Sequence, residues 1–403
     1  MLASSNIFDV AIAGGGPAGT SAAIELAMNG ARVLLIEEKK FPRAKLCGEF
    51  ISPECLTHFK RLGVMEQMRA AGGVSLSETL FYSQRGKSVA VPSEWFKSGS
   101  SALGLSRSEM DHRLLERAKN VGVVVLEEAH ASRLLREHEV VRGVSVKTGD
   151  VARDYRALVT IDATGRTRAL ARHLDRPHRN KRRNTNPMVA FKAHLKNARV
   201  AEGACEIYFY GRGYGGLSGV EGGVSNLCFI VAANDVRRLG SDPERVLSEI
   251  VMKNSRAAHT LAEARAVTPW LSVSLESFGR RTLAPASGLL TVGDAAAFID
   301  PFTGSGMLMA LESGQVAAEI IIRYLTLLRR GAGLELLGNN YQTEYLQRFH
   351  SRLRVSGCLR RAAFFPHLAE AAILLCGTSA HLRRKLARAT RHSTRREIGA
   401  SSS

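Results

Sequence analysis

Residues 8–38 read FDVAIAGGGPAGTSAAIELAMNGARVLLIEE, and this stretch decides the fold. The apolar run 10–13 is typical of a buried parallel strand, and the run 33–36 predicts a second one. Between them stand a glycine-rich turn, the helix-favouring residues SAAIELAM and a break at Asn29-Gly30. The order strand, turn, helix, strand predicts a βαβ unit in a parallel sheet.

The turn at residues 14–19 has the glycine spacing of a dinucleotide-binding fingerprint. Gly14 permits the tight turn, Gly16 lets the backbone approach a pyrophosphate, and Gly19 allows the helix to pack closely on the strand. The helix N-terminus offers free N–H groups to phosphates, and an acid after the second strand accepts hydrogen bonds from a ribose. The stretch therefore predicts a bound dinucleotide, NAD or FAD. Its candidate contacts are Gly14, Gly16, Pro17, Ala18, Gly19, Glu37 and Glu38.

A second glycine-rich stretch lies far downstream, at residues 289–318. It reads LLTVGDAAAFIDPFTGSGMLMALESGQVAA: a short apolar strand, Gly293-Asp294, a small-residue segment and a long helical pattern. With the first stretch it resembles the glutathione-reductase-type flavoproteins, in the branch of p-hydroxybenzoate hydroxylase, geranylgeranyl reductases and flavin-dependent halogenases. The resemblance implies FAD, with the Asp294 carboxylate on a sugar hydroxyl. It also implies that the loop with Pro301, Gly304 and Gly306 faces the flavin ring.

Two further motifs extend the resemblance over about residues 7–320. The Ala-Thr-Gly motif at 163–165 ends a predicted strand, where the family has its second dinucleotide-contacting motif. Arg107 opens a helix after a strand, as an arginine does in the family. Structural alternatives stand beside these roles: Arg107 pairs with Asp111 four residues on, and Asp294 is only a turn residue. The candidate contacts added here are Ala163, Thr164, Gly165, Arg107, Gly293 and Asp294.

The region from about 185 to 285 has a strand-rich pattern, which by resemblance is the antiparallel sheet that roofs the flavin. After residue 330 the chain reads as helices. We therefore predict an α/β protein: a Rossmann-like FAD-binding lobe with an inserted antiparallel β-sheet substrate lobe and a helical C-terminal arm. The expected divisions are 1–184 and 286–330 for the FAD-binding lobe, 185–285 for the substrate lobe and 331–403 for the basic arm.

The loop at residues 41–50, FPRAKLCGEF, follows the acid of the second strand. Its Pro-Arg-x-Lys-x-Cys-Gly run is similar to one in geranylgeranyl reductases, and this resemblance places the cysteine toward flavin and substrate. The cations beside Cys47 favour a thiolate and make it a candidate proton donor; the alternative is a small buried residue that fills space. Glu49 and Tyr214 are further candidates for a proton relay. The residues assigned to the cofactor side of the loop are Arg43, Lys45, Cys47 and Gly48.

Two main reactions are open, because reductases and monooxygenases of this family both use a flavin reduced by a nicotinamide or another reductant. We favour reduction of a carbon–carbon double bond in an apolar or isoprenoid-like substrate. The alternative is an NAD(P)H-dependent monooxygenase that hydroxylates an aromatic or polyketide-type compound. A third, less favoured hypothesis is an FAD-containing electron-transfer or binding module. Aromatic candidates for the substrate pocket are Phe50, Phe191, Phe209, Phe229, Phe298 and Phe302.

Two absences in the sequence narrow the chemistry. The Trp-x-Trp-x-Ile-Pro motif of halogenases is missing from the strand-rich region, so halogenation is disfavoured. No second nucleotide-binding motif accompanies the first, so NAD(P)H, if used, would bind only transiently across the same cleft. Six cysteines occur without a CxxC pair or metal-ligand spacing, which is typical of reduced thiols in a cytosolic protein, and we expect no metal.

The net charge of +19 is uneven, with Lys and Arg concentrated at 166–183 and from 351 onward. No nucleic-acid-binding signature accompanies it, which leaves a solvated basic face, cofactor phosphates or a membrane surface as explanations. The basic C-terminal helices beside the apolar AAILL would suit an anionic lipid surface; the alternative is a helical cap on the substrate lobe. Since no apolar stretch is long enough to span a bilayer, we expect a cytoplasmic protein, peripheral to a membrane at most. No motif indicates the oligomeric state.

Overall fold

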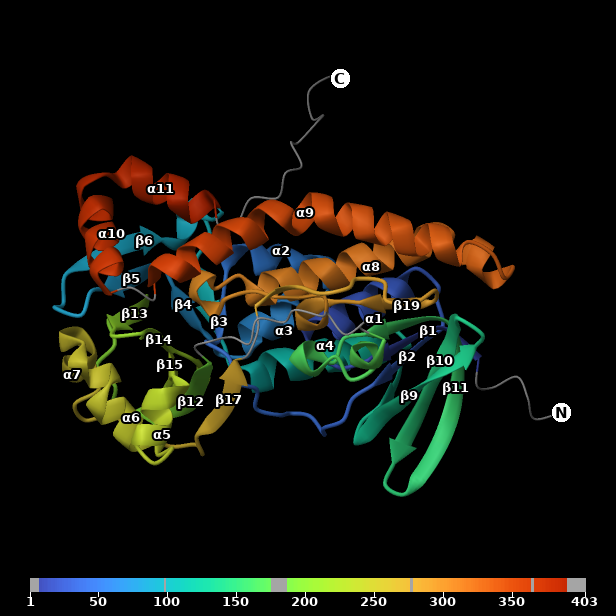
Figure 1. The fold of residues 1–403 in the computed structure, drawn as a ribbon, viewed down its shortest axis with the longest axis horizontal. Helices are drawn as coiled ribbons and strands as arrows, with labels where there is room; N and C mark the ends of the chain where they lie inside the picture. The colour runs from blue at the N-terminus through green and yellow to red at the C-terminus, as the bar shows by residue number, and fades with distance from the viewer. Residues whose placement is uncertain (1–6, 98, 175–186, 276–277, 364–365, 390–403) are drawn as a thin grey trace.

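The computed structural model describes residues 7–97, 99–174, 187–275, 278–363 and 366–389. Two lobes stand side by side, and the long helix α9 runs across the top of both (Figure 1). The lobe with the N-terminal strands lies on the right in this view, and a second β-rich lobe lies on the left.

The right-hand lobe is built on a seven-stranded sheet in the order β8-β2-β1-β11-β10-β9, with β19 also paired to β11. β1 runs parallel to β2 and to β11, and β19 runs parallel to β11. The apolar runs of β1 and β2 are buried, as expected of parallel strands between helices. The predicted Rossmann-like unit is confirmed. Its strands are β1 (Ile7–Ala13), β2 (Val33–Ile36), β8 (Val124–Leu126), β9 (Ala129–Glu137), β10 (Val140–Thr148), β11 (Val151–Asp162) and β19 (Leu289–Thr291), and its main helices are α1 (Pro17–Met28), α4 (Arg107–Asn120) and α8 (Gly306–Arg329).

The helix α1 fits between α4 and α8 because small residues line the contact. A Cβ on Gly314 of α8 would lie 2.3 Å from the carbonyl oxygen of Ala18 in α1. Glycine at this position therefore sets how closely α8 approaches the first helix.

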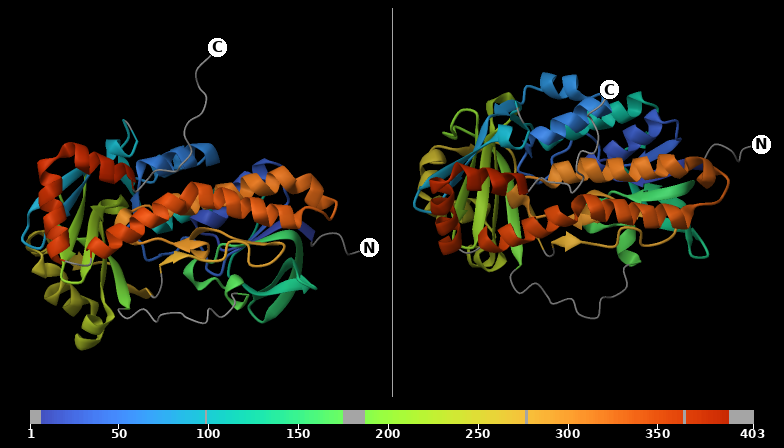
Figure 2. Two further views of the ribbon diagram at one scale, coloured as in Figure 1. Left: turned by 45° about the horizontal axis from the view of Figure 1, so that its top comes forward. Right: turned by 90° about the horizontal axis from the view of Figure 1, so that it is seen from above.

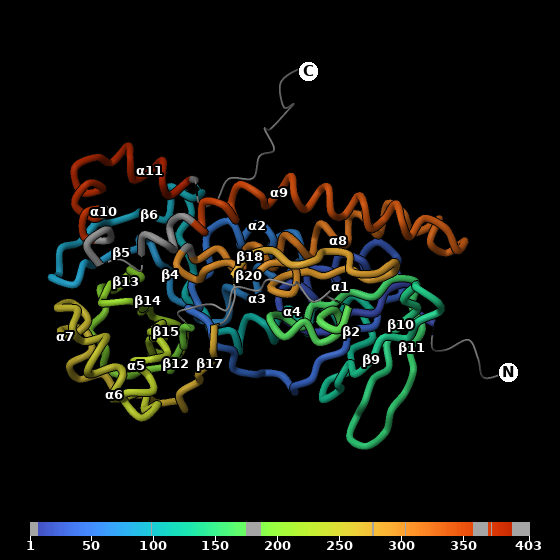
Figure 3. The backbone as a smooth tube through the Cα atoms, viewed as in Figure 1, coloured from blue at the N-terminus to red at the C-terminus, as the bar shows by residue number. Residues whose placement is uncertain are grey.

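The strands β9, β10 and β11 form an antiparallel meander that projects from this lobe (Figure 3). The first half of β11 pairs with β10, and its last three residues pair with β19. The meander is therefore attached to the lobe through β11, the strand that the Ala-Thr-Gly motif follows.

The left-hand lobe contains an eight-stranded sheet in the order β16-β12-β15-β14-β13-β5-β6, with β17 beside β12. β12, β15, β14 and β13 pair antiparallel, as predicted. β5 lies parallel to β13, with Glu78 opposite Ala204. The sequence analysis did not place β5 and β6 in this sheet, because their partner strand β13 comes much later in the chain. The predicted division of the chain into two lobes and an arm remains a prediction. The bounds are β5 (Glu78–Tyr82), β6 (Ser88–Pro92), β12 (Met188–Lys196), β13 (Ala204–Tyr210), β14 (Gly213–Gly219), β15 (Ser225–Ala232), β16 (Arg265–Ala266) and β17 (Leu271–Leu275).

The two faces of this sheet carry separate apolar clusters. On one face Phe191 and Phe229 pack with residues of α5 (Ala233–Arg238), α6 (Pro243–Glu249) and α7 (Ser255–Thr260). The other face holds a set of side chains that we call the apolar cluster. Its members are Leu46, Phe81, Val89, Met188, Ala190, Phe209, Tyr214, Ile230, Val273, Leu275, Phe278, Phe298, Phe302, Ile373 and Cys376. Three of the aromatic pocket candidates belong to it, and two lie on the opposite face.

Short elements connect the lobes. A small sheet in the order β3-β7-β4 follows the loop 41–50, and β18 pairs with β20 just before α8. The bounds are β3 (Phe50–Ile51), α2 (Pro53–Leu62), α3 (Met65–Ala70), β4 (Val74–Leu76), β7 (Ala102–Gly104), β18 (Gly279–Arg280) and β20 (Ala297–Phe298).

The C-terminal arm is helical, as predicted, and consists of α9 (Leu334–Ala363), α10 (Pro366–Thr378) and α11 (Ala380–Ala389). α9 lies along α8, and Nη1 of its buried Arg352 donates to Glu312 of α8 at 2.6 Å. α10 packs on β6 and β13, and α11 packs on β6, so that both turn back over the second lobe (Figure 2). Through Ile373 and Cys376, α10 also joins the apolar cluster.

Candidate functional site

The turn between β1 and α1 depends on its glycines. Gly14 has a φ of +110°, and a Cβ there would lie 2.4 Å from the carbonyl oxygen of Ala163. A Cβ on Gly19 would lie 1.9 Å from the oxygen of Gly14. Around Gly16 the nearest such atom is Nη2 of Arg107 at 3.9 Å, so space remains beside a guanidinium. The turn is tight on its protein side and open toward a cation, as a phosphate site requires.

Glu37, at the end of β2, lies directly over this turn. Its Oε2 accepts the N–H of Gly15 at 2.8 Å, and its Oε1 accepts the N–H of Lys39 at 2.9 Å. Its neighbour Glu38 is exposed and lies 3.9 Å from His130 instead. Glu37 is therefore the acid that the turn positions, whereas the geometry gives Glu38 no place beside it.

Arg107 begins α4 and is held by Asp111 one turn later. Its Nε donates to Oδ1 at 2.8 Å and its Nη2 to Oδ2 at 2.7 Å, and Asp111 is fully buried. Burial alone would lower the pKa of Arg107, but the carboxylate of Asp111 raises it above its ordinary value. Arg43 shares this carboxylate at 3.2 Å and lies 3.4 Å from Glu37. The ion pair considered as an alternative thus exists, and it holds Arg107 next to Gly16.

Asp294 follows β19 in a short 3-10 turn and faces several cations. Burial raises the pKa of its carboxyl, while Arg166, Lys45 and Arg107 act in the opposite direction. Dehydration lowers the pKa of Lys45, and Arg107 and Arg43 lower it further. These mutual electrostatic effects indicate that the loop 41–50, the first residue of α4 and the Gly-Asp motif lie near one another. Sequence reasoning missed Arg166, although it directly follows the Ala-Thr-Gly motif.

The start of α8 also lies beside the first helix. A Cβ on Gly293, whose φ is +59°, would lie 2.9 Å from Cβ of Ala18, and the N–H of Gly293 donates to Ser313 of α8 at 2.8 Å. A 3-10 turn at Pro301–Thr303 leads into α8 through Gly304, which has a φ of +58°. The motifs therefore gather at the carboxyl ends of β1, β2, β11 and β19, where α/β sheets bind their ligands.

These residues fit FAD. The buried carboxylate of Glu37 and the half-buried carboxylate of Asp294 suit sugar hydroxyls, the glycine turn and Arg107 suit the pyrophosphate, and the helix start at Gly306 suits electron-rich flavin. FAD is a dinucleotide with a tricyclic head, and its binding requires hydrogen-bond acceptors, cations and helix N-termini close together. These residues provide all three.

The loop 41–50 carries Cys47 and Glu49 between the two lobes. Cys47 is half-buried, its sulfur accepts the N–H of Glu49 at 3.4 Å, and its carbonyl accepts Nδ2 of Asn226 at 3.1 Å. Glu49 is completely buried and binds two residues of β12, Lys192 and His194. Sequence reasoning named Glu49 but missed both partners, which no local motif announces.

Tyr214 lies inside the apolar cluster, to which Leu46 of the loop 41–50 also belongs. Its hydroxyl donates to Oδ1 of Asp300 at 2.6 Å, and both residues are buried. Burial raises the pKa of Tyr214 well above its ordinary value, and Asp300 raises it further. Phe302 packs edge-on against the Tyr214 ring at a centroid distance of 5.3 Å. The phenol is therefore held as a neutral hydrogen-bond donor.

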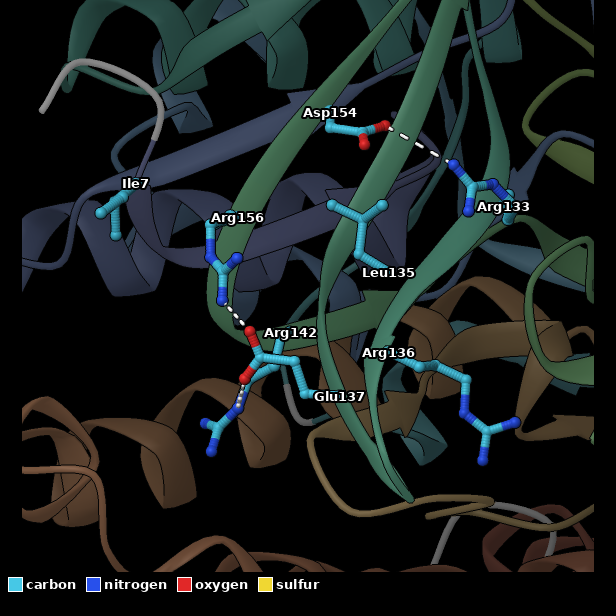
Figure 4. Close-up of a pocket in the computed structure, with 8 residues that line it drawn as sticks. All are labelled: Ile7, Arg133, Leu135, Arg136, Glu137, Arg142, Asp154 and Arg156. Carbon is cyan, nitrogen blue, oxygen red and sulfur yellow. Dashed lines mark hydrogen bonds and ion pairs between the residues drawn. The ribbon is translucent and has the colours of Figure 1, made fainter. Parts of the chain in front are cut away.

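A separate hollow opens on the meander of β9, β10 and β11. Figure 4 shows it between strands, with Arg156 and Arg142 reaching Glu137 and with Arg133 facing Asp154. None of the predicted site residues lines it. Its arginines are exposed or half-buried and already paired with carboxylates, so we assign it no ligand.

Three further observations bound the chemistry of the described residues. They include no cluster of three or more His, Cys, Asp or Glu side chains placed to hold a metal ion. The five cysteines described there are free thiols. A search of the same residues finds no helix with the length and hydropathy to span a bilayer.

Two curated relatives are similar over most of the chain. A digeranylgeranylglycerophospholipid reductase of Methanosarcina mazei is 26% identical over 77% of this chain and 74% of its own length. A menaquinone reductase of Mycobacterium tuberculosis is 29% identical over 78% of this chain and 76% of its own.

Two solved structures share the fold. A geranylgeranyl bacteriochlorophyll reductase-like protein of Thermoplasma acidophilum superposes with a TM-score of 0.79 at 20% identity, covering 94% of this chain and 96% of that one. A flavin-dependent brominase gives a TM-score of 0.77 at 19% identity, covering 96% and 93%. At such identities the likeness concerns the fold alone.

The family model described as "FAD binding domain" matches residues 8–350, which include every motif gathered at the strand ends and the whole substrate sheet. The predicted FAD cofactor and the predicted membership of the flavoprotein branch are confirmed. The chain belongs to the FAD binding domain family and is an FAD-dependent oxidoreductase.

Proposed function

We propose that this enzyme reduces a carbon–carbon double bond in an apolar, isoprenoid-like chain. The observation that carries the proposal is the apolar cluster, which continues from the substrate sheet to Leu46, one residue before Cys47. A hydrocarbon chain lying there would reach the loop that the FAD motifs surround. The relatives named as reductases of digeranylgeranylglycerophospholipid and menaquinone support the same substrate class.

The cofactor residues take three tasks in this proposal. The glycine turn, Pro17 and Ala18 bind the pyrophosphate, Glu37 and Asp294 bind sugar hydroxyls, and the loops around 163–165 and 301–306 flank the flavin. Bound FAD, once reduced, would supply the hydride that the reduction needs. NAD(P)H as its transient reductant remains part of the proposal.

The substrate side is assigned to residues of both lobes. Cys47, half-buried at the end of the apolar cluster, is proposed as the proton donor to the substrate. Tyr214, held by Asp300, positions the chain by its phenol and by its ring contacts with Phe302.

The direct test is an anaerobic reaction. Protein loaded with FAD and reduced with dithionite is mixed with a polyprenyl lipid, and flavin absorbance and product mass are followed. Reoxidation of the flavin with a gain of two hydrogens per reduced bond supports the proposal. Reoxidation of the flavin only after air is admitted, with an oxygen atom appearing in the product, would instead establish the alternative monooxygenase, which the aromatic side chains Phe209 and Phe302 of the apolar cluster also suit.

A lipid substrate would be met at a membrane, and we propose that the arm makes this contact. Leu374 and Leu375 of α10 are 46% and 62% exposed, and Leu382 and Leu386 of α11 are also exposed. The exposed Arg384 stands among them on α11. Apolar side chains beside cations are the composition that binds anionic lipid surfaces.

Vesicle sedimentation tests this contact. Leu375→Asp should reduce binding to vesicles that contain phosphatidylglycerol, whereas Leu336→Asp, on an equally exposed leucine of α9, should not. Equal vesicle binding by the two variants would indicate that the arm is instead a helical cap packed on the second lobe.

A further inference from the structure

Glu49 binds Lys192 and His194 in the interior between the lobes. Its Oε1 accepts Nζ of Lys192 at 2.5 Å and the N–H of Arg107 at 2.8 Å, and its Oε2 lies 2.7 Å from Nε2 of His194. The side chain of Lys192 is 4% exposed and that of His194 is 17% exposed. We call Glu49, Lys192 and His194 the charged cluster; within it, His194 has the best access to solvent.

Such a cluster is costly for a fold to keep. Burying ions takes several kcal/mol per ion from hydration, and a well-packed apolar set of similar volume is often as stable. Glu49 also holds a φ of +53°, a left-handed conformation that is uncommon for non-glycine residues. Burial raises the pKa of Glu49, but His194 and Lys192 lower it below the ordinary value. The carboxylate is therefore kept ionised between two proton carriers.

The charged cluster adjoins the Cys47 thiol from two sides. The peptide N–H of Glu49 donates to the sulfur at 3.4 Å, and Arg107, whose N–H binds Glu49, interacts with the same sulfur through its side chain. Lys192 lies opposite Cys228 in the β12–β15 register, and Cys228 interacts electrostatically with Cys47. An N–H donor and a guanidinium are the groups that stabilise negative sulfur after a thiol has given up its proton.

We propose that the charged cluster restores the proton of Cys47 after each turnover, an inference that rests on the proposed reduction. In that reaction a hydride from reduced FAD binds one alkene carbon. The π electron pair forms the new bond from the second carbon to the Cys47 proton, and the S–H bond breaks to leave a thiolate. Lys192 then gives a proton to the thiolate, and solvent recharges Lys192 by way of His194. Glu49 remains ionised throughout and acts as a positioning residue, while Lys192 and His194 carry the proton.

An activity-free measurement tests the coupling in the FAD-loaded protein. The rate at which iodoacetamide alkylates Cys47 is followed by mass spectrometry against pH, with Cys47→Ser as the blank. The titratable groups on the loop that carries Cys47 and on the elements packed against this loop come from four parts of the chain. They are Arg43, Lys45 and Glu49 of the loop, Arg107 of α4, Lys192 and His194 of β12, and Cys228 of β15.

The two charge variants should move the rate in opposite directions. Lys192→Met removes a cation and should slow alkylation about tenfold at neutral pH. A rise of about one unit in the pKa of the Cys47 thiol would lower its thiolate population by this factor. Glu49→Gln leaves Lys192 unopposed and should speed alkylation. A cluster that only packs the lobes together would loosen in both variants and speed alkylation in both, and that result, or no change in either, overturns the proposal.

A kinetic comparison separates this inference from the proposed function. In Lys192→Met the first turnover of protonated, prereduced enzyme should keep the wild-type rate, while the steady-state rate falls about 100-fold. Equal losses in both rates would contradict proton restoration. If the wild-type protein reduces no alkene, the proposed function fails, and the alkylation result still decides whether Cys47 and the charged cluster are coupled.

Discussion

Arg107 and Asp111 form a two-pronged ion pair inside the FAD-binding lobe, with Nε and Nη2 at 2.8 and 2.7 Å from the two carboxylate oxygens. The pair fixes a guanidinium next to the open side of Gly16. A residue with no expected role toward the cofactor, Asp111, thereby sets the position of one that has such a role.

Replacing Asp111 should therefore affect both stability and cofactor binding. Asp111→Asn leaves Arg107 and Arg43 without their buried partner, and we expect a loss of about 3 kcal/mol in the free energy of unfolding, with weaker FAD retention. Urea unfolding and flavin fluorescence measure the two effects. Glu109→Gln removes a partly exposed ion pair with Arg113 on the same helix and should cost about 0.5 kcal/mol. Equal effects of the two substitutions would contradict the assignment.

The turn glycines should resist even a methyl group. Gly19→Ala would drive a Cβ into the oxygen of Gly14, so we expect a protein about 3 kcal/mol less stable that purifies with little flavin. Gly211→Ala is the control, since nothing lies within 4 Å of a Cβ there. Flavin absorbance per protein chain reports the outcome, and full flavin content in Gly19→Ala would refute the close packing.

The two carboxylates that we propose to bind sugar hydroxyls give a cofactor prediction. Glu37→Ala and Asp294→Ala should each weaken FAD binding about tenfold to 100-fold, the range for hydrogen bonds to charged groups. Titration of the apoprotein with FAD, followed by flavin fluorescence, measures the change. Asp150→Ala, an exposed acid at the end of the meander, serves as the control. Wild-type affinity in both test variants would remove these residues from the site.

A substitution at Cys47 should distinguish cofactor binding from turnover. Cys47→Ser keeps a side chain of similar size, so FAD should stay bound while turnover falls or the product distribution changes. Flavin content and product analysis by mass spectrometry check the two parts. Unchanged turnover would reduce Cys47 to a packing residue.

His58 of α2 makes the fold sensitive to acid. Burial lowers its pKa from 6.5 to about 4, the nearby Glu312 opposes this change, and Arg61, Arg348 and Arg352 add to it. The unfolded chain therefore binds a proton that the folded chain refuses between these values, and stability falls as the pH drops from about 6.5 to 4. The loss is about 3 kcal/mol. Urea unfolding across this range should show a smaller slope for His58→Gln, and parallel slopes would contradict the assignment.

The sequence predicts the FAD lobe well because its signals are local. Gly14, Gly16 and Gly19 lie within one turn, and Glu37 follows at the end of the next strand, so spacing alone identifies their roles. The sequence periodicity also predicts the antiparallel strands of the second lobe and the helices of the C-terminal arm.

Residues paired across the chain were harder to predict. Glu49 is joined to Lys192 and His194, and nothing near any of the three announces the others. Tyr214 was proposed for a proton relay near the flavin loop, yet its partner is Asp300. Such pairs arise only when the two sheets are placed against each other, and a local pattern carries no information about that placement.

The parallel pairing of β5 with β13 has a consequence for exchanging lobes between relatives. A segment cut at 185 and 285 would lack β5 and β6 and would present the hydrogen-bonding edge of β13 to solvent, where it templates aggregation. If this sheet carries the substrate preference, as we propose, a graft that transfers the preference must transplant residues 78–92 together with the later strands. Two distant stretches of the chain would then have to be exchanged as one unit.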